Sequence, residues 1–160
     1  MKKTNIFKCQ RGASAVEFAI VLPLLLIFIF GIIEFSILFY DKAVITNASR
    51  EGARTAILFD MAGSPPVPIY RTEDQVRAVV ASYCSTHLIN FSSSTVPTVT
   101  APLPPVVSGT PPSRYRTVTV NFTYTFLVLP NILGAVFGGS SLSPLNLTAV
   151  TRMRTENQDT

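Results

Sequence analysis

Cys84 and His87 are the residues whose types and spacing come closest to a metal site. A Cys-x-x-His pair supplies two ligands, whereas zinc sites take three or four ligands from the protein. His87 is the only histidine, and no carboxylate stands at a spacing that would complete the set. The sequence also lacks a glycine-rich phosphate loop and a nucleophile elbow. We therefore expect no bound metal, no cofactor and no enzyme activity.

Two carboxylates, Glu17 and Glu34, stand near the ends of a long apolar run and are candidates for charge pairing. Residues 18–33 carry no charge, and beyond Glu34 the apolar run resumes to residue 40. A bilayer core about 30 Å thick needs roughly 20 apolar helical residues, so residues 13–40 are predicted to form one transmembrane helix. Because a carboxylate inside hydrocarbon is costly, Glu17 and Glu34 are expected to be paired or to reach the interface.

The flanks of this run predict its orientation. Asp41 and Lys42 cancel on the far side, so the short N-terminus is expected in the cytoplasm and residues 41–160 outside it. From Ala13 onward the chain has nine basic and nine acidic residues, so the net charge of +4 comes from the leader alone. This basic balance gives no sign of nucleic-acid binding. Four basic residues and no acidic residue precede the run: Lys2, Lys3, Lys8 and Arg11.

An ordinary secretory signal fits this N-terminus poorly. Such a signal has an apolar core of roughly 7–15 residues, followed by a cleavage site of small residues. Here the core is longer, and the small residues 12–15 precede it. A lipoprotein signal fits no better, because Cys9 also precedes the apolar run.

The segment RGASAVEF has a glycine at the end of a short basic leader and, five positions later, Glu17 followed by Phe18. This arrangement resembles the cleavage site of Flp-type type IV prepilins. The resemblance implies that a prepilin peptidase at the cytoplasmic face cuts between Gly12 and Ala13. It also implies that Glu17 neutralises the new amine of Ala13 on a neighbouring subunit. The alternative is a carboxylate favoured by the helix dipole that still reaches water.

The resemblance narrows further along the chain. VEFAIVLPLLLIFIFGIIEF (16–35) and ASREGARTA (48–56) are together similar to TadE-like pseudopilins of the Tad (tight adherence) pilus system. Members of that family share an early Glu, a proline-containing span, a second Glu and a REGAR-type motif, and the motifs cover about the first third of this chain. The matching residues are Glu17, Pro23, Glu34, Arg50, Glu51, Gly52 and Arg54.

These positions also have plainer interpretations. Glu34 either reaches the outer interface, about 26 Å along the helix from the first glutamate, or makes an intersubunit polar contact. Pro23 is either merely tolerated or kinks the helix and helps the subunit to leave the bilayer. The charged residues of the REGAR motif form either a solvated face or an assembly surface. Ala48, Gly52 and Ala56 predict a narrow groove, packed against the chain's own sheet or another subunit's helix.

The pattern beyond the span predicts an α+β chain, in which the long helix continues into a pilin-like globular domain. A capping box at Thr72 predicts a second helix, on which Cys84 is expected to be buried. Alternating apolar residues predict strands in an antiparallel sheet of two to four strands. The apolar stretch 131–138 is too short to span a membrane and is a candidate for a second membrane contact. The predicted ranges are helix 41–59, helix 73–89, and strands near 96–101, 116–129 and 145–154, with a turn-rich linker at 63–68 and loops in 91–113 and 130–144.

The function that the resemblance implies is a minor, pilin-like structural component needed to assemble a Tad/Flp-type adhesive pilus or a related secretion apparatus. Residues 1–12 are then the leader, and the partners are the prepilin peptidase, other pilins or pseudopilins and the Tad assembly machinery. The expected place is the bacterial inner membrane, as a single-pass protein, or the pilus itself. The alternative is an uncleaved, signal-anchored envelope protein whose outer domain binds a partner. An envelope enzyme has no residues to support it.

Overall fold

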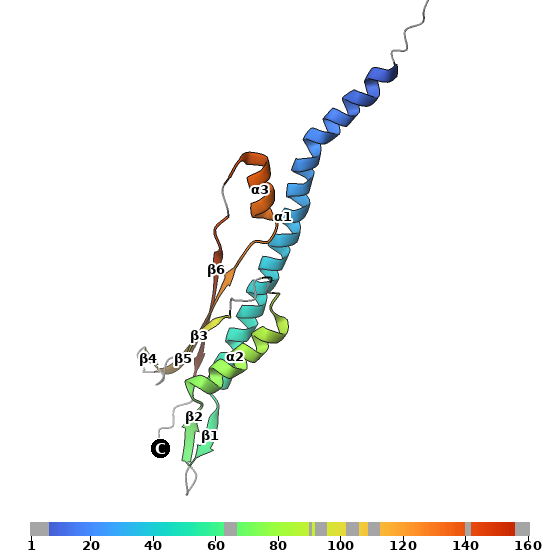
Figure 1. Cartoon of the computed structure of the whole chain (residues 1–160). Coiled ribbons are helices and arrows are strands. Elements are labelled where there is room, and N and C mark those ends of the chain that lie inside the picture. Colours follow the sequence, from blue (N-terminus) through green and yellow to red (C-terminus); the bar gives the residue numbers. More distant parts are fainter. Residues whose placement is uncertain are drawn as a thin grey trace, which may run out of the picture. The chain divides into compact units, whose positions relative to one another are not determined.

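The computed structural model describes residues 7–62, 67–89, 91, 96–101, 106–108, 113–139 and 142–155. Within these ranges a long apolar N-terminal helix is followed by two shorter helices and small antiparallel sheets, which confirms the α+β class (Figure 1). The elements are α1 (Phe7–Ala56), β1 (Phe59–Ala62), β2 (Val67–Tyr70), α2 (Glu73–His87), β3 (Thr98–Thr100), β4 (Val106–Ser108), β5 (Ser113–Tyr124), α3 (Leu129–Phe137) and β6 (Leu145–Arg154).

The chain divides into two compact units. Unit 1 contains the described residues of 1–36 and 126–143, and unit 2 contains those of 37–125 and 144–160. Helix α1 contributes its first part to unit 1 and its last part to unit 2. Unit 1 therefore consists of the apolar part of α1 together with α3, whereas unit 2 contains the strands and α2.

The apolar part of α1 is a candidate membrane span. The helix continues through Pro23, and from Gly12 onward it is long and apolar enough to cross a bilayer. Its most apolar window is not buried within the protein at all. A helix that is apolar on all sides needs lipid or other protein around it.

In unit 2, α1 becomes amphipathic. Its buried face carries apolar and small residues, while the other face is exposed. Ser49 on the buried face hydrogen-bonds Thr151 of β6 over 2.7 Å, and Lys42 donates to the carbonyl of Thr148. This part of α1 thus packs on the sheet through the following buried hydrophobic residues: Leu38, Val44, Ile45, Ala48, Ala53 and Ala56.

Strand β5 is the centre of the four-stranded sheet. It pairs antiparallel with β6 along ten residue pairs, from Tyr115↔Arg154 to Tyr124↔Leu145. Strands β3 and β4 share the opposite edge of β5, since Thr119 pairs with both β3 and β6 and Tyr115 pairs with both β4 and β6. Alternate residues of β5 point into the core, as the period of two predicts. The buried ones are Arg116, Val118, Val120, Phe122 and Tyr124.

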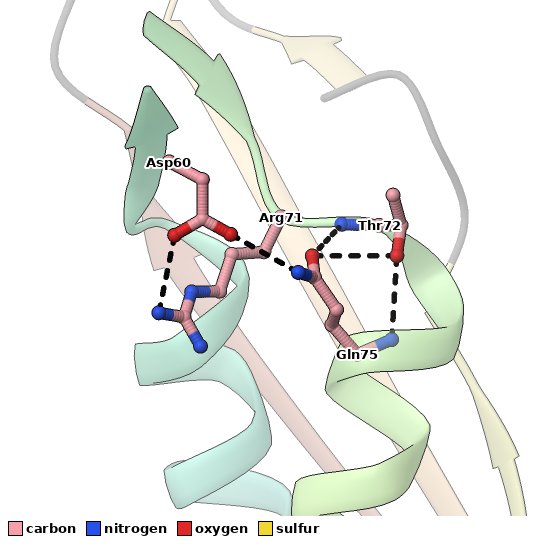
Figure 2. Close-up of polar contacts among 4 residues, drawn as sticks. All are labelled: Asp60, Arg71, Thr72 and Gln75. Carbon is pink, nitrogen blue, oxygen red and sulfur yellow. Dashed lines mark hydrogen bonds and ion pairs between the residues drawn. The ribbon is translucent and has the colours of Figure 1, made fainter. Parts of the chain in front are cut away.

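Helix α2 begins at the predicted capping box, which is tied to the β1–β2 hairpin (Figure 2). Thr72 Oγ1 accepts from the backbone N–H of Gln75 over 3.3 Å, and the Gln75 side chain accepts from the N–H of Thr72 over 2.8 Å. The Gln75 amide also donates to Asp60 of β1, and Asp60 forms an ion pair with Arg71 at 3.2 Å. The cap therefore fixes both the start of α2 and its link to the hairpin.

Arg116 is buried in unit 2 and links β5 to the end of α1. Its Nη1 donates to the carbonyl of Ala56, the last residue of α1, over 3.0 Å and to the carbonyl of Arg71 over 3.3 Å. Its guanidinium lies 5.4 Å from the centre of the Tyr70 ring. Burial lowers the pKa of Arg116, and Tyr70 opposes that shift. A cation at the C-terminus of α1 is favoured by the negative end of the helix dipole.

Several expected bounds differ from the structure. The strand predicted at 116–129 ends at Tyr124. Beyond it the chain enters α3, which occupies most of the segment 130–144 that was expected to be a loop. The segment 91–113 holds two short strands, β3 and β4, where one was expected. The last two residues of the linker predicted at 63–68 belong to β2, which pairs with β1, and α1 ends at Ala56, before residue 59. Residues 1–6 of the leader, 63–66 of the linker and parts of the predicted loops lie outside the described residues.

Candidate functional site on the N-terminal helix

The residues of the prepilin-like motif lie on the exposed first part of α1. Phe18 is 61% exposed, and Ala13 and Glu17 are exposed as well. A Cβ built on Gly12 would meet nothing within 4 Å. Glycine weakens a helix by roughly 1 kcal/mol relative to alanine, so the backbone around Gly12 is easier to unwind than its neighbours. The motif is thus accessible, and Glu17 stands where a neighbouring subunit could reach it.

Most of the apolar side chains that follow the motif are exposed, and a stripe at positions 22, 23, 26, 27, 30 and 31 is half-buried. The protein's own fold therefore leaves most of this surface uncovered, and a membrane or neighbouring helices would have to cover it. Pro23 lies inside the continuous helix and is half-buried. The exposed apolar residues of this stretch include Ile20, Val21, Leu24, Leu25, Phe28, Ile29, Ile32 and Ile33.

Glu34 makes buried polar contacts within unit 1. Its side chain is only 3% exposed, and its Oε1 accepts the backbone N–H groups of Leu127 and Leu129, each over 3.1 Å, and that of Val128. A carboxylate at this place satisfies free amides of the first turn of α3 and meets the positive end of its dipole. Neither interpretation of Glu34 from the sequence included this contact within the chain.

The small residues of the REGAR segment pack against the chain's own elements. A Cβ on Gly52 would lie 2.5 Å from Val80 Cγ2 and 3.2 Å from Val118 Cγ1. Ala48 and Ala56 are buried on the same face. The chain's own sheet, one of the two occupants expected for this groove, lies against Gly52, and so does α2, which was not expected there. Gly52 is therefore required by close packing, and not by an unusual backbone conformation.

The charged residues of the same motif point the other way. Arg50, Glu51 and Arg54 are exposed on α1, opposite the buried face. In unit 2 this arrangement is that of a solvated helix face. It equally leaves three charged side chains accessible to another protein, so their role in assembly stays a prediction.

Cys84 and His87 do not converge on one site. Cys84 is a free, buried thiol, as its apolar neighbours on the helix led us to expect, and burial raises its pKa to about 11. His87 is exposed, its ring stacks on Tyr83 at 4.4 Å, and its Nδ1 contacts the carbonyl of Tyr83 over 2.9 Å. Across the ranges that the structure describes, no three metal-binding side chains gather.

Two features of the structure were missed from the sequence. Asp41 is fully buried and its Oδ1 accepts the N–H of Ile89 over 3.0 Å, whereas in the sequence it was considered only as a charge that cancels that of Lys42. Helix α3 was missed as well. Its signal was present, since Pro130 stands in the first turn and glycines follow the last turn, at positions 138 and 139.

Comparison with known proteins supports the recognition from the sequence. Residues 12–54 match a family model described as TadE-like protein. This is the family that the motifs indicated, and the matched segment runs from Gly12 of the cleavage motif to Arg54 of the REGAR motif. No match was found among the curated proteins or among the solved structures.

Proposed function

We propose that this chain, whose residues 12–54 match the TadE-like family, is a pseudopilin: a minor structural component needed to assemble a Tad/Flp-type adhesive pilus or a related secretion apparatus. In this proposal a prepilin peptidase removes residues 1–12 and leaves Ala13 as the new N-terminus. The observation that carries it is the match itself, which joins the cleavage motif, the apolar helix and the REGAR segment in one stretch.

The exposed apolar helix supports the same proposal. A subunit of a pilus-like assembly passes from the membrane to a filament, and its apolar helix is covered by lipid in the first place and by neighbouring helices in the second. The apolar part of α1 is exposed in the protein, so either lipid or neighbouring helices can cover it. In the filament, Glu17 would meet the free amine of Ala13 on a neighbouring subunit, so that two buried charges cancel.

Location and partners follow from this role. The chain is a single-pass protein of the bacterial inner membrane, with its N-terminus in the cytoplasm and its folded C-terminal part outside. Its partners are the prepilin peptidase, other pilins or pseudopilins and the Tad machinery, with the exposed Arg50, Glu51 and Arg54 as candidates for contact. We propose a structural role without enzyme activity, cofactor or nucleic acid.

The first test is the N-terminus of the protein recovered from membranes with and without the cognate prepilin peptidase. Intact mass and N-terminal sequencing should show a start at Ala13 only where the peptidase is present. Gly12→Val should keep the leader, and since a side chain at Gly12 meets nothing, a folding defect would not explain that result. Gly31→Val is the matched control, because Gly31 also lies on α1 in open space, and it should be processed normally.

A second variant separates processing from assembly. Glu17→Gln keeps the size and removes the charge, so it should be processed at Ala13 but fail to support pilus assembly, scored by pilus shearing and microscopy. A leader retained by the parent protein in the presence of the peptidase would contradict the proposal. It would leave the uncleaved, signal-anchored protein whose outer domain binds a partner.

A further inference from the structure

Helix α3 has a surface unlike that of a helix in water. The chain carries no charge from residue 117 to residue 151, a stretch that includes α3 and both of its flanks. Phe137 at the end of α3 is 72% exposed, and Leu127 and Val136 are also exposed. A water-facing helix normally turns polar and charged residues outward. The outward face of α3 is instead mostly apolar, and its exposed polar residue, Asn131, donates its side-chain amide to the carbonyl of Leu127 over 3.4 Å.

The backbone at the start of α3 is satisfied without water. Glu34 accepts the amides of residues 127–129, Pro130 has no amide hydrogen, and Asn131 and Ile132 both donate to the carbonyl of Val128 over 3.1 Å. A helix in water can leave its first amides to the solvent, whereas a helix in hydrocarbon cannot. This complete internal bonding is what a lipid environment requires.

At the other end of α3, one carbonyl receives two backbone hydrogen bonds. The amides of Gly138 and Gly139 both donate to the carbonyl of Gly134, over 3.1 and 3.3 Å. Both glycines have positive φ angles, 72° and 77°, the left-handed conformation that commonly ends a helix. The helix thus has internal hydrogen bonds at both ends.

Within unit 1, α3 adjoins the apolar part of α1 (Figure 1). Phe126 and Phe35 pack edge to face with their ring centres 6.2 Å apart. An apolar hollow of about 370 Å³ lies beside Leu129, with Phe28 and Ile32 of α1 in its wall. The surface of α3 is therefore continuous with that of the candidate membrane span.

We propose that α3 is a second membrane element, which lies in the outer leaflet beside the transmembrane helix, and that Glu34 is the internal cap that allows its start to leave water. This inference depends on the proposed membrane span. The nine residues of α3 are about 14 Å long at 1.5 Å per residue, too short to cross the bilayer. The occupant of its outward face and of the hollow is lipid acyl chain.

The absence of tryptophan from the sequence allows a direct test. Three single variants, Phe137→Trp on α3, Phe28→Trp on the span and Phe91→Trp in unit 2, replace an exposed phenylalanine in each case. The full-length protein is placed in vesicles of phosphatidylcholine brominated on the acyl chains, and fluorescence is compared with unbrominated vesicles and with aqueous iodide. The bromines should quench Phe137→Trp and Phe28→Trp several-fold more than Phe91→Trp, and iodide should show the reverse order.

Failure of this inference differs from failure of the proposed function. If Phe28→Trp is quenched by bromine and Phe137→Trp by iodide, α3 lies in water and the inference is overturned while the span stands. If neither quencher reaches Phe137→Trp, protein covers α3, which also overturns it. If Phe28→Trp is not quenched by bromine, the span itself is wrong and both proposals fall.

Glu34 variants in the Phe137→Trp protein test the cap. Glu34→Ala removes the acceptor of three amides, so bromine quenching should drop several-fold as α3 leaves the lipid. Glu34→Gln keeps an oxygen at the same position and should retain most of the quenching. Equal quenching in all three proteins would show that Glu34 does not hold α3 in the leaflet.

Discussion

Gly52→Ala should destabilise unit 2 although alanine is the better helix former. The new Cβ would lie 2.5 Å from Val80 Cγ2 and 3.2 Å from Val118 Cγ1, and both valines are fully buried. Overpacking of this kind costs about 1–3 kcal/mol, while the helix gains roughly 1 kcal/mol. With the cost at the upper end of that range, unit 2 loses about 2 kcal/mol of stability. The fraction of molecules in which unit 2 is open then rises approximately 30-fold.

The buried thiol of Cys84 offers a local readout of this loss. Cys84 is 1% exposed on α2, one turn from Val80, so its alkylation requires α2 to open. Replacement of Cys9 by serine makes Cys84 the sole cysteine of the full-length protein. In detergent micelles, and with reclosing faster than reaction, Gly52→Ala should raise the alkylation rate about 30-fold. Asn47→Ala, an exposed change on the same helix, should leave it unaltered.

A double mutant decides whether Val80 is the cause. Val80→Ala removes the methyl group that the new Cβ meets, so Gly52→Ala should add at most a few-fold to the rate in that background. If Gly52→Ala reacts at the rate of the parent protein, or if the two changes multiply independently, the close contact is not what limits this position.

Three further predictions concern the same unit. Thr72→Ala removes the capping box and should lower the free energy of unfolding by about 1 kcal/mol in urea titrations, whereas Thr72→Ser should retain most of it. The pKa of Cys84 rises from 9.0 to about 11, so the native state holds this proton longer than the unfolded state, and stability should fall from pH 9 to pH 11. Cys84→Ala should show a smaller fall over that window, and identical profiles would refute the assignment. Arg116→Met deprives two carbonyls of a charged donor and should cost about 1–3 kcal/mol, seen as a lower urea midpoint; an unchanged midpoint would mean that the buried charge contributes nothing net.

Local patterns in the sequence were sufficient to predict several helices and strands. The uncharged run predicted α1, and the capping box predicted the start of α2. The alternation of apolar and polar residues predicted a strand at 145–154, the range that β6 occupies. These signals lie within a few residues of one another and do not depend on the rest of the chain.

What the sequence did not reveal depends on contacts between distant residues. Strand β5 stops at Tyr124 because amides 127–129 bond to Glu34, more than 90 positions earlier. Arg116 reads as an ordinary polar residue at the start of a strand, yet the carbonyls of Ala56 and Arg71 hold it in the core. For the candidate site, the sequence was sufficient to name the motif residues. It did not reveal which elements pack against Gly52 or which amides bond to Glu34, because those groups are distant in the chain.

The bonds between Glu34 and the start of α3 also bear on the order of folding. The two ends of this contact are separated by 93 to 95 residues, so the acceptor is synthesised long before its donors. Closing so long a loop directly is entropically unfavourable. The β5–β6 hairpin flanks α3 on both sides, so pairing of its strands would already hold α3 in a short connection. We expect α3 to dock late in folding, after the β5–β6 hairpin has formed, so that Glu34 receives its three amide donors only at that stage.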